Sequence, residues 1–266
     1  MQLSKYKLFL ILIVASAISM ASSCKKTEPV EDPVTTGSLN MSFDFYFDNN
    51  PIIFDSMMYV NAAGNEYMVY EVRYFISKVT IYKAGVATVL NGWANEHLIH
   101  SKIPTTLNWP IVDKIEAGNY DSISFTLGFT DADNIPYMFV NPPETEMVWP
   151  EYLGGGYHYL KIEGKWKAPN DYLRGSAFHL GRGQIYDAGG IITGFIDNSF
   201  RVSLPNSSFS ITATNSTNVT LRMHIEQWFE NPTVYDHNVY GGDIMSNQES
   251  MGIVRDNGWN VFELIK

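Results

Sequence analysis

Residues 154–164 read Gly-Gly-Gly-Tyr-His-Tyr-Leu-Lys-Ile-Glu-Gly, and residues 176–183 read Ser-Ala-Phe-His-Leu-Gly-Arg-Gly. In the first run, apolar and aromatic residues stand between glycines, which predicts a mostly buried strand with a breaker at each end. The second run, up to its first glycine, predicts another strand. Because alternate side chains of a strand lie on opposite faces, His158 and His179 each point away from their apolar neighbours. One histidine on each strand therefore departs from the apolar pattern.

The same strand signals continue on both sides of this stretch. Residues 39–47 alternate between apolar and polar side chains, and residues 66–83 are rich in β-branched and aromatic types, which predicts two strands with a kink near Ser77. Further strands are expected at 120–129, 191–204, 208–214, 218–228 and 260–265. Helix-period stretches are scarce. The pattern predicts an all-β protein, a single antiparallel β-sandwich domain of Greek-key type with long loops, over residues 38–266.

Residues 84–118 carry Gly, Pro and Asn at short intervals, which predicts loops. His97 and His100 lie three residues apart in this segment. That spacing could hold a metal on a helical turn, but no apolar face supports a helix here. Solvated loop histidines are the expectation.

The first residues predict export. Lys5 and Lys7 precede a short apolar run at 8–14, and small residues then lead to Cys24, the only cysteine. This pattern is typical of a bacterial lipoprotein signal at 1–23, with Cys24 as the lipidated N-terminus; the alternative is an ordinary secretory leader with a chance cysteine. The polar, proline-containing residues 24–37 predict a tether.

The composition limits the partners. The formal net charge is −10, which argues against nucleic acid and against direct contact with an anionic membrane. We therefore expect the membrane to be reached through the lipid anchor only, at the outer membrane, with the domain facing the periplasm or the cell exterior. A domain without cysteine must build any soft metal site from Met and His.

Five short motifs, in this order and spacing, resemble the MbnP-like family of periplasmic copper-binding proteins. They are Tyr-Phe-Ile-Ser-Lys-Val (74–79), Gly-Asn-Tyr-Asp-Ser-Ile (118–123), Met-Val-Trp (147–149), Gly-Tyr-His-Tyr-Leu-Lys-Ile-Glu-Gly (156–164) and Phe-His-Leu-Gly (178–181). The resemblance implies a β-rich extracytoplasmic copper protein. It also implies a partner, a dihaem enzyme of the cytochrome c peroxidase type that oxidises a tryptophan to kynurenine. Within the resemblance, Trp149 matches a recurrent tryptophan and His179 matches the histidine of the Phe-His-x-Gly motif.

The candidate copper ligands are imidazoles and a thioether, since thioether favours the reduced ion. They are His179, His224, His237, His158 and Met147. The alternative for each histidine is a structural one that hydrogen-bonds across the sheet.

Catalysis by the chain itself is not expected, because no Gly-x-Ser-x-Gly elbow, His-Glu-x-x-His or phosphate-binding glycine loop occurs. The competing function is glycan binding at a surface lipoprotein. Its stacking platforms would be Trp93, Trp109, Trp149 and Trp228.

Overall fold

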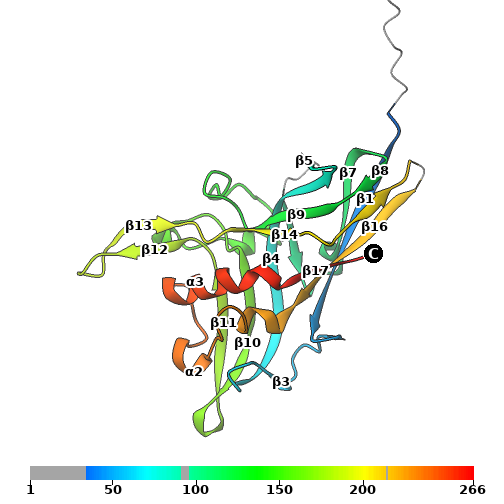
Figure 1. The fold of residues 1–266 in the computed structure, drawn as a ribbon. Helices are drawn as coiled ribbons and strands as arrows, with labels where there is room; N and C mark the ends of the chain where they lie inside the picture. The colour runs from blue at the N-terminus through cyan, green and yellow to red at the C-terminus, as the bar shows by residue number, and fades with distance from the viewer. Residues whose placement is uncertain (1–33, 91–95, 214) are drawn as a thin grey trace, which may run out of the picture. The chain divides into compact units, whose positions relative to one another are not determined.

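The computed structural model describes residues 34–90, 96–213 and 215–266. The 18-residue strand β4 (Glu66–Lys83) is central to the larger of the two main sheets (Figure 1). The strand order in this sheet is β11 (Tyr172–Leu180), β10 (Leu160–Ala168), β4, β9 (Ser122–Leu127) and β14 (Phe200–Leu204). Three further strands pair with β4, namely β3 (Tyr59–Val60), β5 (Val86–Val89) and β6 (Glu96–His100). The expected two strands with a kink are one strand, interrupted at Lys78, where φ is 51° and the register to β9 shifts.

The second sheet is centred on β1 (Thr36–Phe47). Its order is β17 (Phe262–Ile265), β16 (Ser216–His224), β1 and β2 (Asn50–Pro51), and β7 (Asn108–Glu116) also pairs with β1. The period-2 pattern holds along β1, because Leu39, Met41, Phe43 and Phe45 are buried while the residues between them are half-buried. β1 and β16 run parallel, whereas the other strand pairs are antiparallel.

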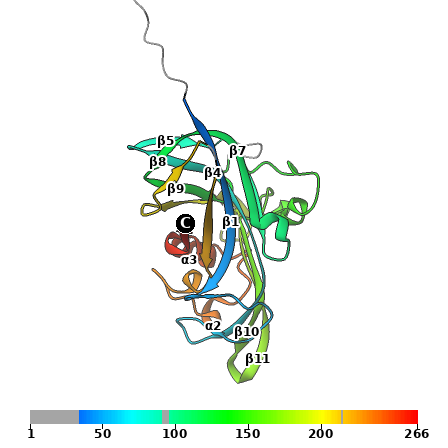
Figure 2. The same cartoon turned by 90° about the vertical axis from the view of Figure 1, so that its right-hand side faces the viewer.

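The core lies between these two sheets. Phe45 of β1 meets Tyr74 of β4 at 6.4 Å between ring centroids, and Phe262 of β17 meets both Tyr74 and Phe125 at 5.7 and 5.2 Å. Burial of such large aromatic side chains from both sheets is the main stabilising term of this fold. Figure 2 shows β1 in front of the β4, β10 and β11 layer. The predicted all-β antiparallel sandwich is confirmed, with one difference, the parallel pairing of β1 with β16.

The prediction of loops at 84–118 is wrong, since this segment supplies β5, β6, β7 and the short β8 (Gly118–Tyr120). β7 contains Pro110 and pairs with β1 along one edge, and an edge strand tolerates proline because it need not donate every hydrogen bond.

His97 and His100 are part of β6 and are not solvated. The ring of His97 stacks on Trp109 with centroids 4.9 Å apart, and His100 is buried.

The remaining elements are short. β12 (Gly183–Tyr186) and β13 (Ile192–Ile196) form a separate hairpin that projects from the two sheets in Figure 1, and β15 (Phe209–Ile211) pairs with β8. Within the described ranges, the α-helices are α2 (His237–Tyr240) and α3 (Gln248–Asn257). Turns of 3-10 helix occupy Pro104–Leu107, Glu144–Met147, Glu151–Leu153, Pro169–Asp171, Ile225–Phe229 and Gly258–Asn260.

The predicted signal segment 1–23, the lipidation site Cys24 and most of the tether 24–37 lie outside the described residues. The first strand begins at Thr36, two residues before the predicted start of the domain at Ser38. None of the helices in the described ranges is long and apolar enough to cross a membrane.

Candidate metal centre

Two of the predicted histidines come together beside the β10–β11 pair. His179 lies near the end of β11 and pairs with Lys161 of β10, while His158 lies just before β10. The backbone N–H of Tyr159 donates to the carbonyl of Leu180 at 2.8 Å, so pairing continues past the start of β10. The two imidazole rings meet edge to face, with centroids 5.1 Å apart.

His158 is held in one tautomer. Its Nδ1 lies 3.0 Å from the carbonyl oxygen of Met147, which can only accept, so the proton is assigned to Nδ1. Nε2 is buried and has no hydrogen-bond partner among the described residues. Burial lowers the pKa of His158 to about 3, with a further contribution from the charge of His179. A buried neutral imidazole with a free lone pair is therefore present.

His179 is held from both nitrogens. Its Nε2 lies 3.3 Å from Glu163 Oε1, and its Nδ1 lies 3.4 Å from the sulfur of Met245. The hydrogen bond with His179 lowers the pKa of Glu163 to about 2, and Lys161, whose Nζ is 3.3 Å from the same oxygen, lowers that pKa further. The carboxylate can then only accept. In the neutral imidazole the single proton is thus on Nε2, and the Nδ1 lone pair faces a thioether that has no hydrogen to donate.

Trp149 forms the wall behind His158. Its indole is fully buried, its Nε1–H donates to the carbonyl of Leu153 at 3.1 Å, and its ring centroid lies 4.7 Å from that of His158. A Cβ on Gly181 would lie 2.5 Å from Cε3 of the indole. Gly181 is therefore required for the close approach of β11 to this wall.

The other predicted ligands lie elsewhere. His224, at the end of β16, is 3.5 Å from Glu226 and 3.3 Å from Glu263, and the hydrogen bond with Glu226 raises its pKa. His237 begins α2, where Asn61 Nδ2 lies 3.3 Å from its Nδ1. Met147 does reach the centre, but through its carbonyl oxygen, which contacts His158.

Met245 is the residue that the sequence did not single out. It lies in the loop before α3, and this loop runs beside β11 because Asp243 forms a parallel bridge with Ala177. The bridge places Met245 level with His179. No local pattern marks this methionine; only the contact between segments 66 residues apart does.

The centre offers two imidazoles and one thioether. Among the residues that the structure describes, no group of three or more His, Cys, Asp or Glu side chains could hold a metal ion. A nitrogen and a sulfur bound to one ion at about 2.0 and 2.3 Å stand roughly 3.1–3.8 Å apart, and the Nδ1–Sδ distance of 3.4 Å lies in that range. His179 Nδ1 and Met245 Sδ therefore have a spacing that one ion can span, and imidazole with thioether is a ligand combination that suits Cu(I).

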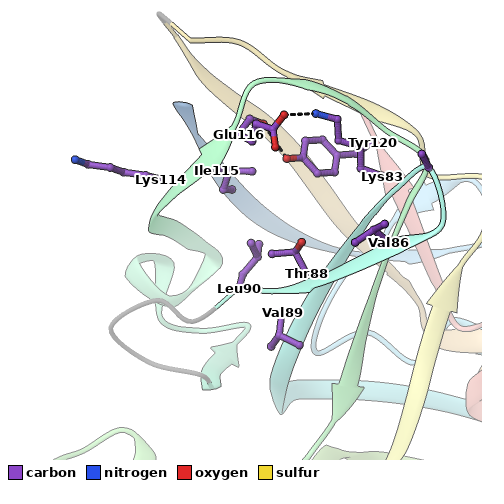
Figure 3. A pocket seen from close by; sticks show the side chains of 10 residues that line it. Lys83, Val86, Thr88, Val89, Leu90, Lys114, Ile115, Glu116 and Tyr120 are labelled. Carbon is purple, nitrogen blue, oxygen red and sulfur yellow. Dashed lines mark hydrogen bonds and ion pairs between the residues drawn. The ribbon is translucent and has the colours of Figure 1, made fainter. Parts of the chain in front are cut away.

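A separate cavity lies elsewhere in the fold. A cavity of about 720 Å³ between the β4–β5 turn and β7–β8 is lined by Lys83, Lys114, Glu116, Tyr120 and neighbouring aliphatic residues (Figure 3). Its lining, as far as the structure describes it, contains no histidine or methionine. The His158–His179 pair is the candidate site because two imidazoles and a thioether meet there, whereas this cavity holds an ion pair between Lys83 and Glu116.

A sequence profile of the MbnP family matches residues 36–246. The chain belongs to the MbnP family. Among solved structures, it is similar to MbnP from Methylosinus trichosporium, with a TM-score of 0.57 and 14% identity over 87% of this chain and 99% of that one. At this identity the likeness shows the MbnP fold alone. A comparison with curated protein sequences finds no match.

Proposed function

We propose that this MbnP-family chain binds one copper ion in the reduced state, through His158, His179 and Met245. The observation that carries the proposal is the free Nε2 of His158, a buried nitrogen without a partner among the described residues, beside a second histidine whose Nδ1 faces a thioether. Leaving a buried polar atom without a hydrogen bond costs about 1–3 kcal/mol of stability. A ligand bound to this nitrogen would offset that cost.

The donor chemistry favours Cu(I) over other ions. Thioether sulfur is a soft ligand that prefers Cu(I), and no cysteine is present in residues 25–266 to provide thiolate for zinc or iron–sulfur sites. Because the pKa of His158 lies near 3, protons do not compete for its Nε2 at neutral pH. Second contacts to Met147 O and Glu163 orient the two imidazoles, as outer contacts do in known metal sites.

The biological setting extends this proposal. The leader that ends at Cys24 supports a lipid-anchored protein at the outer membrane, facing the periplasm or the exterior. The chain would act as a binding protein rather than an enzyme. The family resemblance supports a dihaem peroxidase-type partner that oxidises Trp149 to kynurenine, and Trp149 lies beside the proposed ligand His158. Intact-mass analysis of the protein produced with and without that partner tests the modification.

Glycan binding finds less support. Trp149 and Trp228 are fully buried, and Trp93 lies outside the described residues. Trp109 borders a cavity of about 400 Å³ lined by Asn40, Asn108 and Asn218, but its indole stacks on His97 with ring planes 3° apart. One face of that ring is therefore already covered by His97.

Anaerobic titration with a Cu(I)-specific colorimetric chelator as competitor tests the copper proposal. The protein should retain one equivalent of Cu(I) in the presence of the chelator, and added zinc should not displace this copper. A protein that takes up no Cu(I), or that binds only after His158 and His179 have been exposed by denaturant, would refute the proposal.

A further inference from the structure

A small surface cavity opens next to the proposed copper ligands. It has a volume of about 320 Å³ and is lined by Tyr152, Leu153, Asp243, Met245, Ser246 and Asn247. Tyr152 is 74% exposed, so the mouth of this cavity reaches solvent. Met245 thus contributes both to the lining of this cavity and to the centre, where its sulfur is 3.4 Å from His179 Nδ1.

The other approaches to the two imidazoles are less suitable for a cation. Trp149 covers His158, and the Met147 carbonyl occupies its Nδ1. On the far side of His179, the Nε2 proton faces Glu163, and the ammonium group of Lys161 lies 3.3 Å from that carboxylate. The Glu163 side of His179 therefore offers no lone pair, and the positive charge of Lys161 repels an approaching cation.

The cavity side has the opposite chemistry. Asp243 is exposed at the lining, so a carboxylate attracts cations to the mouth. Met245 is half-buried, and an unbranched thioether has enough rotatable bonds to turn between the cavity and His179. A soft cation that meets this sulfur first is then one ligand exchange away from imidazole nitrogen.

We propose, resting on the copper function above, that this cavity is the entrance through which a soft monovalent cation reaches the histidines, with Met245 as the first protein ligand. Asp243 draws the ion to the mouth. Met245 binds it at the floor and delivers it to His179 Nδ1 and His158 Nε2. Entry rate is therefore set by the cavity, whereas final affinity is set by the two imidazoles and the thioether together.

The experiment uses Ag(I) nitrate in chloride-free buffer, because Ag(I) is a soft, redox-inert monovalent cation. Binding is followed by stopped-flow quenching of tryptophan fluorescence, since Trp149 lies beside His158, and the affinity is measured separately at equilibrium. Ser246→Phe narrows the cavity. Lys165→Phe places the same phenyl ring on the Glu163 face of β10, away from the cavity, and is the control. Asp243→Asn removes the charge but keeps the side-chain oxygen that accepts from the N–H of Met245.

We expect Ser246→Phe to slow binding by about tenfold or more, with equilibrium affinity within about twofold of wild type. Asp243→Asn should slow binding and weaken its dependence on salt, and Lys165→Phe should bind at the wild-type rate. Should Ser246→Phe fail to fold, Tyr152→Ala offers the reverse test, because removal of this exposed side chain widens the mouth and should speed binding.

Unchanged rates in Ser246→Phe and Asp243→Asn, or slowing by Lys165→Phe alone, would overturn the entrance. Cu(I) uptake by the wild-type protein, measured by chelator competition, is checked first. If that uptake is absent, the copper function fails and the entrance fails with it. If uptake is stoichiometric and only the rates are insensitive to these changes, the entrance fails alone.

Discussion

His158 and His179 meet edge to face, with ring centroids 5.1 Å apart and ring planes 88° to each other. His158 donates its ring proton to the Met147 carbonyl, and His179 donates its ring proton to Glu163. This leaves His158 Nε2 and His179 Nδ1 without a proton, and an imidazole nitrogen can bind a metal only through such a free lone pair. The sheet register creates this arrangement, because β10 and β11 pair Lys161 with His179 and leave His158 at the end of the same strand pair.

Removal of either imidazole should abolish tight copper binding. We expect His158→Ala and His179→Ala each to weaken Cu(I) affinity by more than about 100-fold, since loss of a ligand exceeds the cost of losing an outer contact. Chelator competition measures this. His224→Gln is the control, because His224 is engaged with Glu226 and Glu263 away from the centre, and it should bind as wild type does.

Two results would count against the ligand assignment. Full Cu(I) affinity in His179→Ala would remove this histidine from the site. Loss of folding in His179→Ala, with no separate loss of binding in His158→Ala, would indicate that His179 stabilises the sheet through its hydrogen bond to Glu163 and its packing against Met245.

Glu163 should act through the orientation of His179. Glu163→Ala removes the acceptor at Nε2, and we expect copper affinity to fall by about tenfold or more. Glu163→Gln keeps an acceptor oxygen for the same proton, so it should retain more affinity than the alanine variant. Equal losses in the two variants would indicate that charge, rather than the fixed tautomer, is what Glu163 supplies.

The sandwich was predictable because its strands bury one face. The alternation along β1 is a direct consequence of packing against the β4 sheet. The expectation that Gly164 ends its strand is wrong, because β10 continues through it to Ala168, and a Cβ there would lie 2.0 Å from the carbonyl oxygen of Met68 on β4. The edge strands were not predictable in the same way. β5 is exposed at every position and β7 contains Pro110, so neither shows the apolar alternation of a half-buried strand.

The candidate site was predictable only in part, for a related reason. His158 and His179 interrupt apolar runs, which is a local signal. Met245 belongs to a loop that reaches β11 through the bridge between Asp243 and Ala177, and no local pattern encodes a contact at that sequence distance. His224 and His237 carry similar local signals, but in the fold His224 lies beside carboxylates and His237 lies among aromatic rings.

The stability of the domain should fall in mild acid, and His237 should account for part of this fall. Its ring is buried against Tyr67, Trp166, Phe229 and Tyr235, and burial lowers its pKa to about 4. An unfolded histidine titrates near 6.5, so between about pH 6.5 and about pH 4 the unfolded chain binds a proton that the folded chain does not. The free energy of unfolding therefore decreases as pH falls through this window, by about 3 kcal/mol for this group.

Urea unfolding at about pH 7 and about pH 4.5 measures the effect. His237→Phe cannot titrate, and we expect it to lose less stability between the two pH values than wild type. His224→Gln serves for comparison, because the pKa of His224 is raised and its proton stabilises the fold in acid. An equal loss in wild type and His237→Phe would rule out His237 as the source.

Membrane attachment should depend on Cys24. In Cys24→Ala the predicted lipid acceptor is absent, so the exported protein should move from the detergent phase to the aqueous phase on Triton X-114 partitioning. Ser23→Ala is the control, since it keeps the cysteine and a small residue before it. Unchanged partitioning of Cys24→Ala would favour the ordinary secretory leader.

The wall formed by Trp149 should be sensitive to a single methyl group. A Cβ on Gly181 would lie 2.5 Å from the indole, which cannot retreat easily because its Nε1–H is bonded to Leu153. We expect Gly181→Ala to lower the free energy of unfolding by about 1–3 kcal/mol, as overpacking of a dense core does. We also expect weaker Cu(I) binding, since a displaced indole presses on His158.

Gly175→Ala is the matched control on β11, because nothing lies within 4 Å of its Cβ position, and it should keep both wild-type stability and wild-type Cu(I) affinity. Wild-type stability and affinity in Gly181→Ala would show that the indole can move aside, and the wall would then have no part in positioning His158.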